Sequence, residues 1–530
     1  MRHVEPPRAG AGVRRLPRWL FWSGLALATA LYLFQGYGLA RRMVTWTDES
    51  AYVHLGYLAA GGRISLFQDE LTGSRMPLPF WVLGASQLVW GRNLRAARLT
   101  ALGIGLVALA LTALIARRLA GDLAGLLAVC FFATQGVLVG YFATATYHSL
   151  AAGILLGGLA LIVAVRRPWG PALGMVALSF LFLTRTNLWP IIPGALLVLV
   201  FQARTVRERL GLIAAAAAVP VAFFLSDVRH LKIVAYVPVI GRLVRSLGYP
   251  AGFALVDIPE PVLWDRLWAF VRLGRMYEFW ALAALLLCLM VAGRRLRGRA
   301  TPVVFSDRWT IWLAVLIVYI AFWQVLILWK FPKAIVGWFP SFAPLCAVLL
   351  GVGFARLLSL PDLGRRARGV TIGALVALLL APVIIVRHPL LVSGADAHAA
   401  PLQDLGAAAA HFRRDVKPGA KVFLWGDSFP LYLAGILPYL QQIHSTNTYA
   451  LVEDRVAIEK SGLWGRKEME RWLSTEADYV VLEPRTLDEY RARHPDPMAR
   501  FDALLREHFD LVDRIEDYRW QSFELYARRR

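Results

Sequence analysis

The chain has 530 residues, of which 58% are hydrophobic and 18% are charged, and its formal net charge is +22. This composition is too apolar for an ordinary soluble domain of that length and indicates an integral membrane protein. Residues 1–386 contain 38 Lys and Arg against 14 Asp and Glu, placed in short segments beside apolar runs, so nucleic acid is not an expected partner.

Eleven apolar runs approach or exceed the roughly 20 residues that a helix needs to cross a bilayer. The sequence therefore predicts about 11 transmembrane helices. They lie near residues 18–40, 95–117, 122–141, 145–165, 170–186, 188–203, 210–226, 276–293, 308–329, 334–357 and 369–387.

Arginines cluster in the N-terminal segment and after every second apolar run. The positive-inside rule places these clusters in the cytoplasm. Arg41 and Arg42 fall on the opposite side and argue weakly against this orientation. With an odd number of spans, the N-terminus is cytoplasmic and the C-terminal part is outside. There are only seven lysines and no N-x-S/T sequon, so we expect a bacterial cytoplasmic (inner) membrane with a periplasmic C-terminal domain.

Two segments of the membrane part lie on the outer side. Residues 41–94 contain TDESAYVHLGYLAA and then PLPFWVLGASQLVW, which is too short to span and suits a helix lying at the interface. Residues 227–275 contain PVIGRLVRSLGYP (238–250), a second candidate interfacial helix. The sequence thus predicts a transmembrane domain over 1–387, with a long outer loop at 41–94.

The remainder, 388–530, has the pattern of a soluble α/β domain. Strands are predicted at 421–427, 478–484, 511–517 and 520–529, and helices at 407–416, 468–477 and 498–509. The first strand ends in Gly-Asp-Ser (426–428), which also occurs at the nucleophile of some esterases. No D-x-x-H follows Ser428, so we interpret Asp427 and Ser428 as a turn and helix cap.

Asp48 and Glu49 follow the first apolar run directly. A carboxylate at a membrane helix end must face water or a polar cavity. The triplet Thr47-Asp48-Glu49 is also typical of a capped helix start, and the two interpretations are compatible because a capped helix fixes an acid rigidly.

The order of motifs narrows this choice. After the acids come RMPLPFW (75–81), then NLRAARLTAL (93–102), then a span and the turn RRLAGDLAG (117–125). This series resembles the GT-C membrane glycosyltransferases, in the branch of protein O-mannosyltransferases and aminoarabinose (lipid A) transferases. The resemblance is strongest over 45–125 and weaker to about 358, and it implies a GT-C fold.

The resemblance implies transfer of a sugar from a polyprenyl-phosphate carrier to an acceptor hydroxyl on the outer face, with inversion. Asp48 would be the general base, and Glu49 either its partner in the site or a capping acid. Lys330 and Lys333, in LWKFPKAIVGW (328–338), would bind the donor phosphate, unless they only anchor the helix end at lipid headgroups. Arg75 and Arg98 are further phosphate candidates. The acceptor, whether glycan, lipid or protein, is not indicated.

Five residues are candidates for binding the acceptor or sugar: Tyr52, His54, Tyr147, His148 and Arg185. For His54, an ordinary interfacial polar role is favoured. His148 stands where many relatives have a second acid, so the chain departs from them there. An imidazole removes one carboxylate ligand, and the residues therefore do not support a divalent metal, although the chemistry allows one.

A transporter or flippase of a lipid-linked sugar is the alternative function. Transporters usually carry charged residues in mid-span and repeated halves, whereas the ionisable residues here lie at helix ends and no repeat is found. A mere anchor for the C-terminal domain would not need eleven spans.

Overall fold

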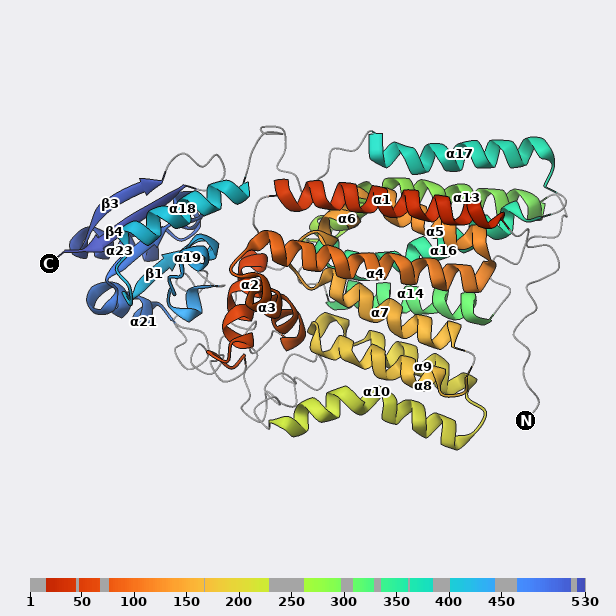
Figure 1. The fold of residues 1–530 in the computed structure, drawn as a ribbon, viewed down its shortest axis with the longest axis horizontal. Helices are drawn as coiled ribbons and strands as arrows, with labels where there is room; N and C mark the ends of the chain where they lie inside the picture. Colours follow the sequence, from red (N-terminus) through yellow and green to blue (C-terminus); the bar gives the residue numbers. More distant parts are fainter. Residues whose placement is uncertain are drawn as a thin grey trace.

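The computed structural model of the chain describes residues 16–43, 47–66, 76–165, 167–227, 262–296, 308–327, 335–360, 363–384, 401–443, 465–515 and 522–529. Long helices form a bundle at one end of the molecule, and a small sheet with its helices lies at the other end (Figure 1). Two short helices, α2 and α3, lie between them and run across the bundle axis.

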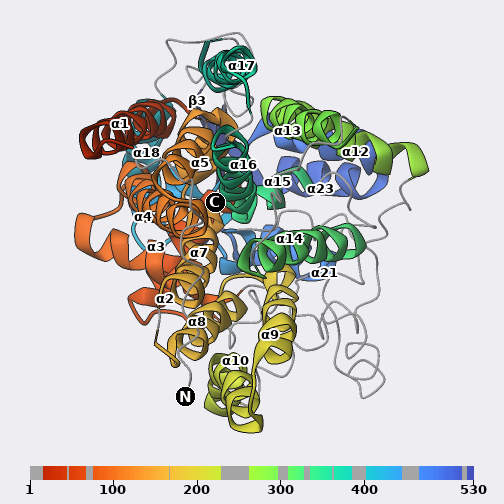
Figure 2. The same cartoon turned by 90° about the vertical axis from the view of Figure 1, so that its right-hand side faces the viewer.

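A helix occupies each of the eleven predicted apolar runs, because a chain in lipid must satisfy its backbone hydrogen bonds internally. These helices are α1 (Arg18–Arg42), α4 (Leu94–Ala120), α5 and α6 (Asp122–Thr134 and Gly136–Phe142), α7 (His148–Ala164), α8 (Gly170–Ser179), α9 (Ile191–Gln202), α10 (Val206–Ser226), α13 (Glu278–Leu296), α14 (Arg308–Ile327), α16 (Ala343–Leu358) and α17 (Arg365–Ile384). Figure 2 shows the bundle turned by 90°, with many of its helices nearly end-on.

Fewer helices than eleven meet a strict criterion of length and apolarity for crossing a membrane. Among the described residues, five do so, or six if α5 and α6, which are bent by 76° at Gln135, count as one broken span. The α7, α8, α9 and α16 regions are apolar but shorter. The protein is thus a multi-span membrane protein, and a total of eleven crossings stays a prediction.

The described part of residues 41–94, the predicted outer loop, contains two packed helices, α2 (Thr47–Ala60) and α3 (Pro77–Trp90). Helix α3 coincides with the predicted interfacial helix. The two helices approach backbone to backbone, since a Cβ atom added to Gly84 would lie 2.0 Å from the carbonyl oxygen of Gly56. On α3, Trp81 and Trp90 remain exposed, as expected of interfacial anchors.

The C-terminal domain contains a four-stranded mixed sheet of order β1-β2-β4-β3. Its strands are β1 (Val422–Trp425), β2 (Tyr479–Leu482), β3 (Phe509–Ile515) and β4 (Phe523–Arg528), with the β1–β2 pair parallel and the other two pairs antiparallel. Helices α18 (Pro401–Asp415), α19 (Phe429–Ala434), α21 (Arg466–Arg471), α22 (Pro484–Arg493) and α23 (Pro495–His508) accompany the sheet. All four strands coincide with predicted ones.

The predictions missed some helices and could not be checked in one loop. Helix α12 (Leu263–Met276), which exposes Trp264 and Trp268, was not predicted, nor were α19 and α22. The predicted interfacial helix at 238–250 lies outside the described residues. Short helices α15 (Ile335–Trp338) and η7 (Phe339–Ser341) precede α16, and η1 (Phe180–Leu183) and η2 (Thr186–Leu188) connect α8 to α9.

One hydrophobic core extends from the bundle into the C-terminal domain. The large cluster around α4, α5, α7 and α16 also includes Leu405, Phe429, Tyr432 and Ile443 of the C-terminal domain. Two smaller clusters lie on the two faces of the sheet. The C-terminal domain is therefore packed against the membrane part, and helix α2 lies at the junction.

Candidate functional site

Helix α2 begins at Thr47, so Asp48 and Glu49 lie in its first turn, where negative charge is favoured by the helix dipole. The Thr47 side chain lies outside the described residues, and its predicted capping role is not tested. Successive residues of a helix are rotated by about 100°, so the two neighbouring acids point in different directions. Their surroundings differ accordingly.

Glu49 is fully buried and forms an ion pair with Arg98 of α4. Arg98 donates from Nε to Oε1 at 2.9 Å and from Nη2 to Oε2 at 2.7 Å, which is the bidentate geometry of strong guanidinium–carboxylate pairs. The backbone N–H of Ala145, before α7, donates to the same carboxylate at 2.7 Å. Glu49 thus joins α2, α4 and the segment that leads into α7.

Arg98 also contacts the end of α1 through its remaining donor group. Its Nη1 donates to the carbonyl oxygens of Ala40 and Met43, at 2.9 and 2.8 Å, at the end of α1. Arg98 is fully buried. These contacts argue against the prediction that Arg98 binds the donor phosphate, and they favour a structural role for both Arg98 and Glu49.

Asp48 is only half-buried and lies among different neighbours. It is close enough to Tyr147, His148 and Arg185 to interact electrostatically with each of them. These residues come from separate parts of the chain: Tyr147 and His148 from the start of α7, and Arg185 from the link between η1 and η2. The structure therefore brings Asp48 together with three of the five predicted acceptor- or sugar-binding residues.

Arg185 is the centre of an aromatic cage. Its guanidinium carbon lies 4.4 Å from the ring centroid of Tyr147 and 5.5 Å from that of Trp338. Its Nη1 also donates a long hydrogen bond of 3.5 Å to the hydroxyl of Tyr52, one turn after Asp48. Aromatic faces hold a guanidinium through cation–π attraction and leave its edge for other partners. The cage places a fixed positive charge beside Asp48.

His148 contacts both the cage and a residue before α16. Its ring centroid lies 4.1 Å from that of Tyr147, and its Nδ1 shares a 3.1 Å hydrogen bond with the hydroxyl of Ser341. The imidazole is buried, so it fixes α7 against the segment around η7.

The structure adds two polar residues, Asn187 and Gln324, that were not singled out from the sequence. The amide of Asn187 and the hydroxyl of Tyr147 are buried without a hydrogen-bond partner among the described residues. Gln324 of α14 donates to the Asn187 carbonyl oxygen at 3.1 Å, and its own amide oxygen likewise has no partner in that part of the chain. The only signal in the sequence was their polarity within apolar runs, which does not show where they meet.

His54, the fifth of these predicted residues, does not join the Asp48 group. It points instead to the C-terminal domain, where its Nδ1 shares a 3.3 Å hydrogen bond with Ser428 and its ring lies 4.9 Å from that of Tyr432. Burial, together with the charge of Arg92, lowers the pKa of His54 to about 3, so the ring is neutral at neutral pH. Ser428 and His54 are both buried, so this pair is not an accessible nucleophile and base.

The remaining predicted phosphate ligands cannot be placed. Lys330, Lys333 and Arg75 lie outside the described residues. Their roles stay predictions.

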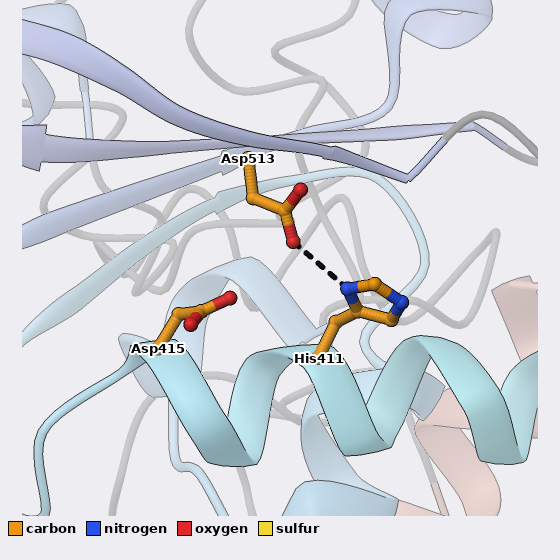
Figure 3. Close-up of side chains that lie close together, drawn as sticks. All are labelled: His411, Asp415 and Asp513. Atoms are coloured by element: carbon orange, nitrogen blue, oxygen red, sulfur yellow. Dashed lines mark hydrogen bonds and ion pairs between the residues drawn. The ribbon is translucent and has the colours of Figure 1, made fainter.

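A separate polar cluster in the C-terminal domain contains His411, Asp415 and Asp513, whose potential ligand atoms lie within 4.8 Å of one another (Figure 3). His411 Nδ1 lies 2.8 Å from Asp513 Oδ2, and the guanidinium of Arg414 contacts Asp415 at 2.7 Å and Asp513 at 3.1 Å. The hydrogen bond from Arg414 holds the pKa of Asp415 below its usual range. Because the guanidinium of Arg414 already pairs with both acids, we interpret the cluster as an ion-pair network that ties α18 to β3.

Comparison with known proteins supports the fold. No family model matches the chain, and no curated protein matches it by sequence. Among solved structures, ArnT from Cupriavidus metallidurans bound to undecaprenyl phosphate has a TM-score of 0.53 at 15% identity, covering 96% of this chain and 98% of that one.

Two further structures are similar over nearly all of this chain. The Archaeoglobus fulgidus oligosaccharyltransferase tethered with an acceptor peptide has a TM-score of 0.53 at 12% identity, covering 97% of this chain and 74% of that one. The arabinofuranosyltransferase AftD from Mycobacteria has a TM-score of 0.50 at 15% identity, covering 97% and 40%. The chain therefore has the fold of the GT-C membrane glycosyltransferases, as the motif order predicted.

Proposed function

We propose that this protein transfers a sugar from a polyprenyl-phosphate carrier to an acceptor hydroxyl on the outer face of the membrane, with Asp48 as the general base. The observation that carries the proposal is that the two adjacent acids have different surroundings. Glu49 forms a buried ion pair with Arg98, whereas Asp48 is half-buried beside Arg185, Tyr147 and His148. The GT-C fold and the undecaprenyl phosphate bound in ArnT support the donor class.

The chemistry needs one base. The acceptor oxygen attacks the anomeric carbon as its proton passes to the Asp48 carboxylate. The bond from the anomeric carbon to the phosphate oxygen breaks, and its electron pair leaves with the lipid phosphate. With a single carboxylate in this role, the displacement is direct and inverts the anomeric centre.

Charge on the leaving phosphate requires nearby cations. Among the described residues of the site, Arg185 supplies such a cation, because its guanidinium is fixed on two aromatic rings and faces the Asp48 group. Lys330 and Lys333 keep their proposed role as phosphate ligands. Asn187 and Tyr147, whose polar atoms lack partners among the described residues, are suited to the sugar hydroxyls.

The same arrangement supports a proposal for the orientation in the membrane. Helix α2, which carries Asp48, the start of α4 and the C-terminal domain lie at one end of the bundle, and Arg117 and Arg118 lie at the other end of α4. By the positive-inside rule, we propose that the arginine end is cytoplasmic and that transfer takes place on the outer side.

The test is sugar transfer in liposomes from a polyprenyl-phosphate donor, comparing wild type with Asp48→Asn. The amide has the same size but cannot take a proton, so we expect transfer to fall by about 10²- to 10⁴-fold. Asp122→Asn is the matched control, because Asp122 pairs with Arg117 at the opposite end of α4. Unimpaired transfer by Asp48→Asn would remove Asp48 as the base.

Two measurements sharpen the result. Consumption of the donor distinguishes transfer from flipping, because a flippase moves the lipid-linked sugar without releasing the carrier. Titration of the carrier phosphate against Lys330→Ala and Lys333→Ala tests the predicted phosphate ligands. Unchanged affinity in both variants would show that these lysines do not bind the phosphate and only anchor the helix end at lipid headgroups.

A further inference from the structure

Helix α2 presents three different faces to three different parts of the protein. At about 100° per residue, Asp48 and Tyr52 lie on one face, and Ser50, His54 and Tyr57 lie on roughly the opposite one. The first face meets Arg185 and Tyr147. The opposite face meets the C-terminal domain, and Glu49 points sideways to Arg98.

The contacts of the opposite face come from one segment of the C-terminal domain, the turn after β1 together with helix α19. Ser50 donates a hydrogen bond to Oδ1 of Asp427, and His54 shares one with Ser428. Tyr432 packs on the rings of His54 and Tyr57, at centroid distances of 4.9 and 5.5 Å. These side chains of the turn are buried, so the contact is an internal interface rather than a loose surface encounter.

Tyr432 of α19 also connects this segment to α3 and to the start of α4. The hydroxyl of Tyr432 donates to Gln87 at 3.1 Å, and Gln87 accepts from the backbone of Asn93, the N-cap of α4. Arg92 donates to the carbonyl oxygen of Tyr432 and lies over the rings of Tyr57 and Tyr432. Residues 426–434 therefore contact α2, α3 and the segment that leads into α4.

Asp427 is built to make its contact with Ser50 rigid. Its Oδ1 also accepts from the backbone N–H of Phe429 at 2.9 Å, and its own N–H donates to Glu483 at 3.2 Å. The preceding Gly426 has a φ of 140°, and a Cβ atom there would lie 2.6 Å from the Cβ of Glu483. Only glycine allows the turn to approach β2 in this way.

We propose that the C-terminal domain is a working part of the transfer site and that Asp427 is its positioning residue, which fixes Asp48 by holding Ser50 on the opposite face of α2. The inference rests on the proposed function. Asp427 reaches no reacting atom itself, since it lies behind the helix. Its effect is on the position of Asp48, and a base displaced by about 1 Å loses up to about 10²-fold in rate.

The test compares Ser50→Ala with Ser50→Thr in the full-length protein. Alanine removes the donor and leaves the Asp427–Phe429 turn intact, whereas threonine retains the hydroxyl. We expect kcat to fall by about 10- to 100-fold in Ser50→Ala, with KM for the lipid donor unchanged, and to recover in Ser50→Thr. Ser86→Ala is the matched control, because Ser86 is a buried serine of α3 that donates only within its own helix.

A second readout does not depend on activity. Hydrogen exchange of the α2 backbone should accelerate in Ser50→Ala and in Asp427→Ala, but not in Ser86→Ala. Asp427→Asn retains an acceptor oxygen and should behave like wild type in this measurement.

The outcomes separate the two proposals. If Asp48→Asn abolishes transfer while Ser50→Ala keeps the wild-type kcat, the positioning role is wrong and the proposed function stands. If Asp48→Asn retains transfer, Asp48 is not the base, and the exchange of α2 still decides whether Asp427 holds the helix. Unchanged exchange in both Ser50→Ala and Asp427→Ala would overturn the inference.

Discussion

Arg98 binds Glu49 through two parallel hydrogen bonds, of 2.9 and 2.7 Å, in a site that excludes solvent from both side chains. The pair joins helix α4 to α2, and through two further carbonyl contacts it also joins the end of α1. Because these contacts hold Glu49, the backbone of the neighbouring residue Asp48 is also fixed. The pair explains why two acids stand side by side at the membrane surface: one anchors the helix, and the other faces the proposed reaction.

Removal of Arg98 should be costly. Arg98→Ala leaves Glu49 charged and buried without its cation, for which a loss of about 3–5 kcal/mol of stability is expected. Arg98→Lys should rescue little, because an ammonium group cannot make the bidentate contact and reach both carbonyl oxygens. The measurement is the thermal unfolding midpoint in detergent.

The control for this prediction is another ion pair on the same helix. Arg117 pairs with Asp122 at 2.6 Å, but the arginine side chain is 48% exposed, so Arg117→Ala should cost about 1 kcal/mol or less. Equal midpoints for Arg98→Ala and Arg117→Ala would contradict a structural role for the buried pair.

Arg185 should matter for transfer more than for stability. Loss of one preorganised charge stabiliser in an active site typically lowers the rate by about 10²- to 10³-fold, and we expect this for kcat/KM in Arg185→Ala. Arg185→Lys should recover only part of the rate, because an ammonium group does not stack on Tyr147 and Trp338 as a planar guanidinium does.

Arg95→Ala controls for the loss of an arginine that lies over an aromatic ring near the N-terminal end of α4. Arg95 lies 5.4 Å from the ring centroid of Tyr37 and is exposed. We expect its transfer rate to match wild type. Full activity of Arg185→Ala would show that the aromatic cage serves packing alone.

The sequence was most informative where structure follows from local composition. Apolar runs locate the bundle helices because lipid imposes internally satisfied backbones, and short apolar runs locate the buried strands β1 and β2. The motif order also brought Asp48, Tyr52, Tyr147, His148 and Arg185 into one hypothesis, and the structure places these five near one another.

Partnerships across long separations were not predictable from the sequence. Arg98 is 49 residues from Glu49, and Ser50 is 377 residues from Asp427. Nothing in the local pattern distinguishes a buried arginine with a carboxylate partner from an exposed one that binds phosphate. For the same reason, His54 was assigned to the sugar-binding group, although its helix face turns it toward Ser428 instead.

The stability of the docked C-terminal domain should depend on Glu483. Burial, and then the neighbouring charge of Asp427, raise the pKa of this carboxyl to about 7 from a usual value of 4.5. The folded state therefore favours the protonated acid. Its stabilising contribution is complete below about pH 4.5 and is lost as the pH rises through about 7.

Glu483→Gln tests this dependence, because the amide stays neutral and keeps an oxygen to accept from the Asp427 N–H. Relative to wild type, the variant should gain stability at pH 8, by up to about 3 kcal/mol for a shift of this size, and little at pH 4. The measurement is the free energy of unfolding of the variant minus that of wild type, taken from pH 4 to pH 8. His54, whose pKa is lowered rather than raised, titrates in both proteins, so its contribution cancels in this difference. A difference that does not change with pH would contradict the raised pKa.

The close contact between α2 and α3 gives the last prediction. A Cβ atom on Gly84 would lie 2.0 Å from the Gly56 carbonyl oxygen and 2.9 Å from the Tyr57 N, and a backbone obstacle of this kind cannot move aside as a flexible side chain could. Gly84→Ala should therefore separate the two helices, lower the unfolding midpoint and reduce transfer, because α2 carries Asp48. Gly103→Ala in α4 meets no atom within 4 Å and should be neutral or stabilising by up to about 1 kcal/mol, since alanine is the better helix former. A Gly84→Ala protein as stable and as active as Gly103→Ala would show that the packing of α3 on α2 does not determine the position of the acid.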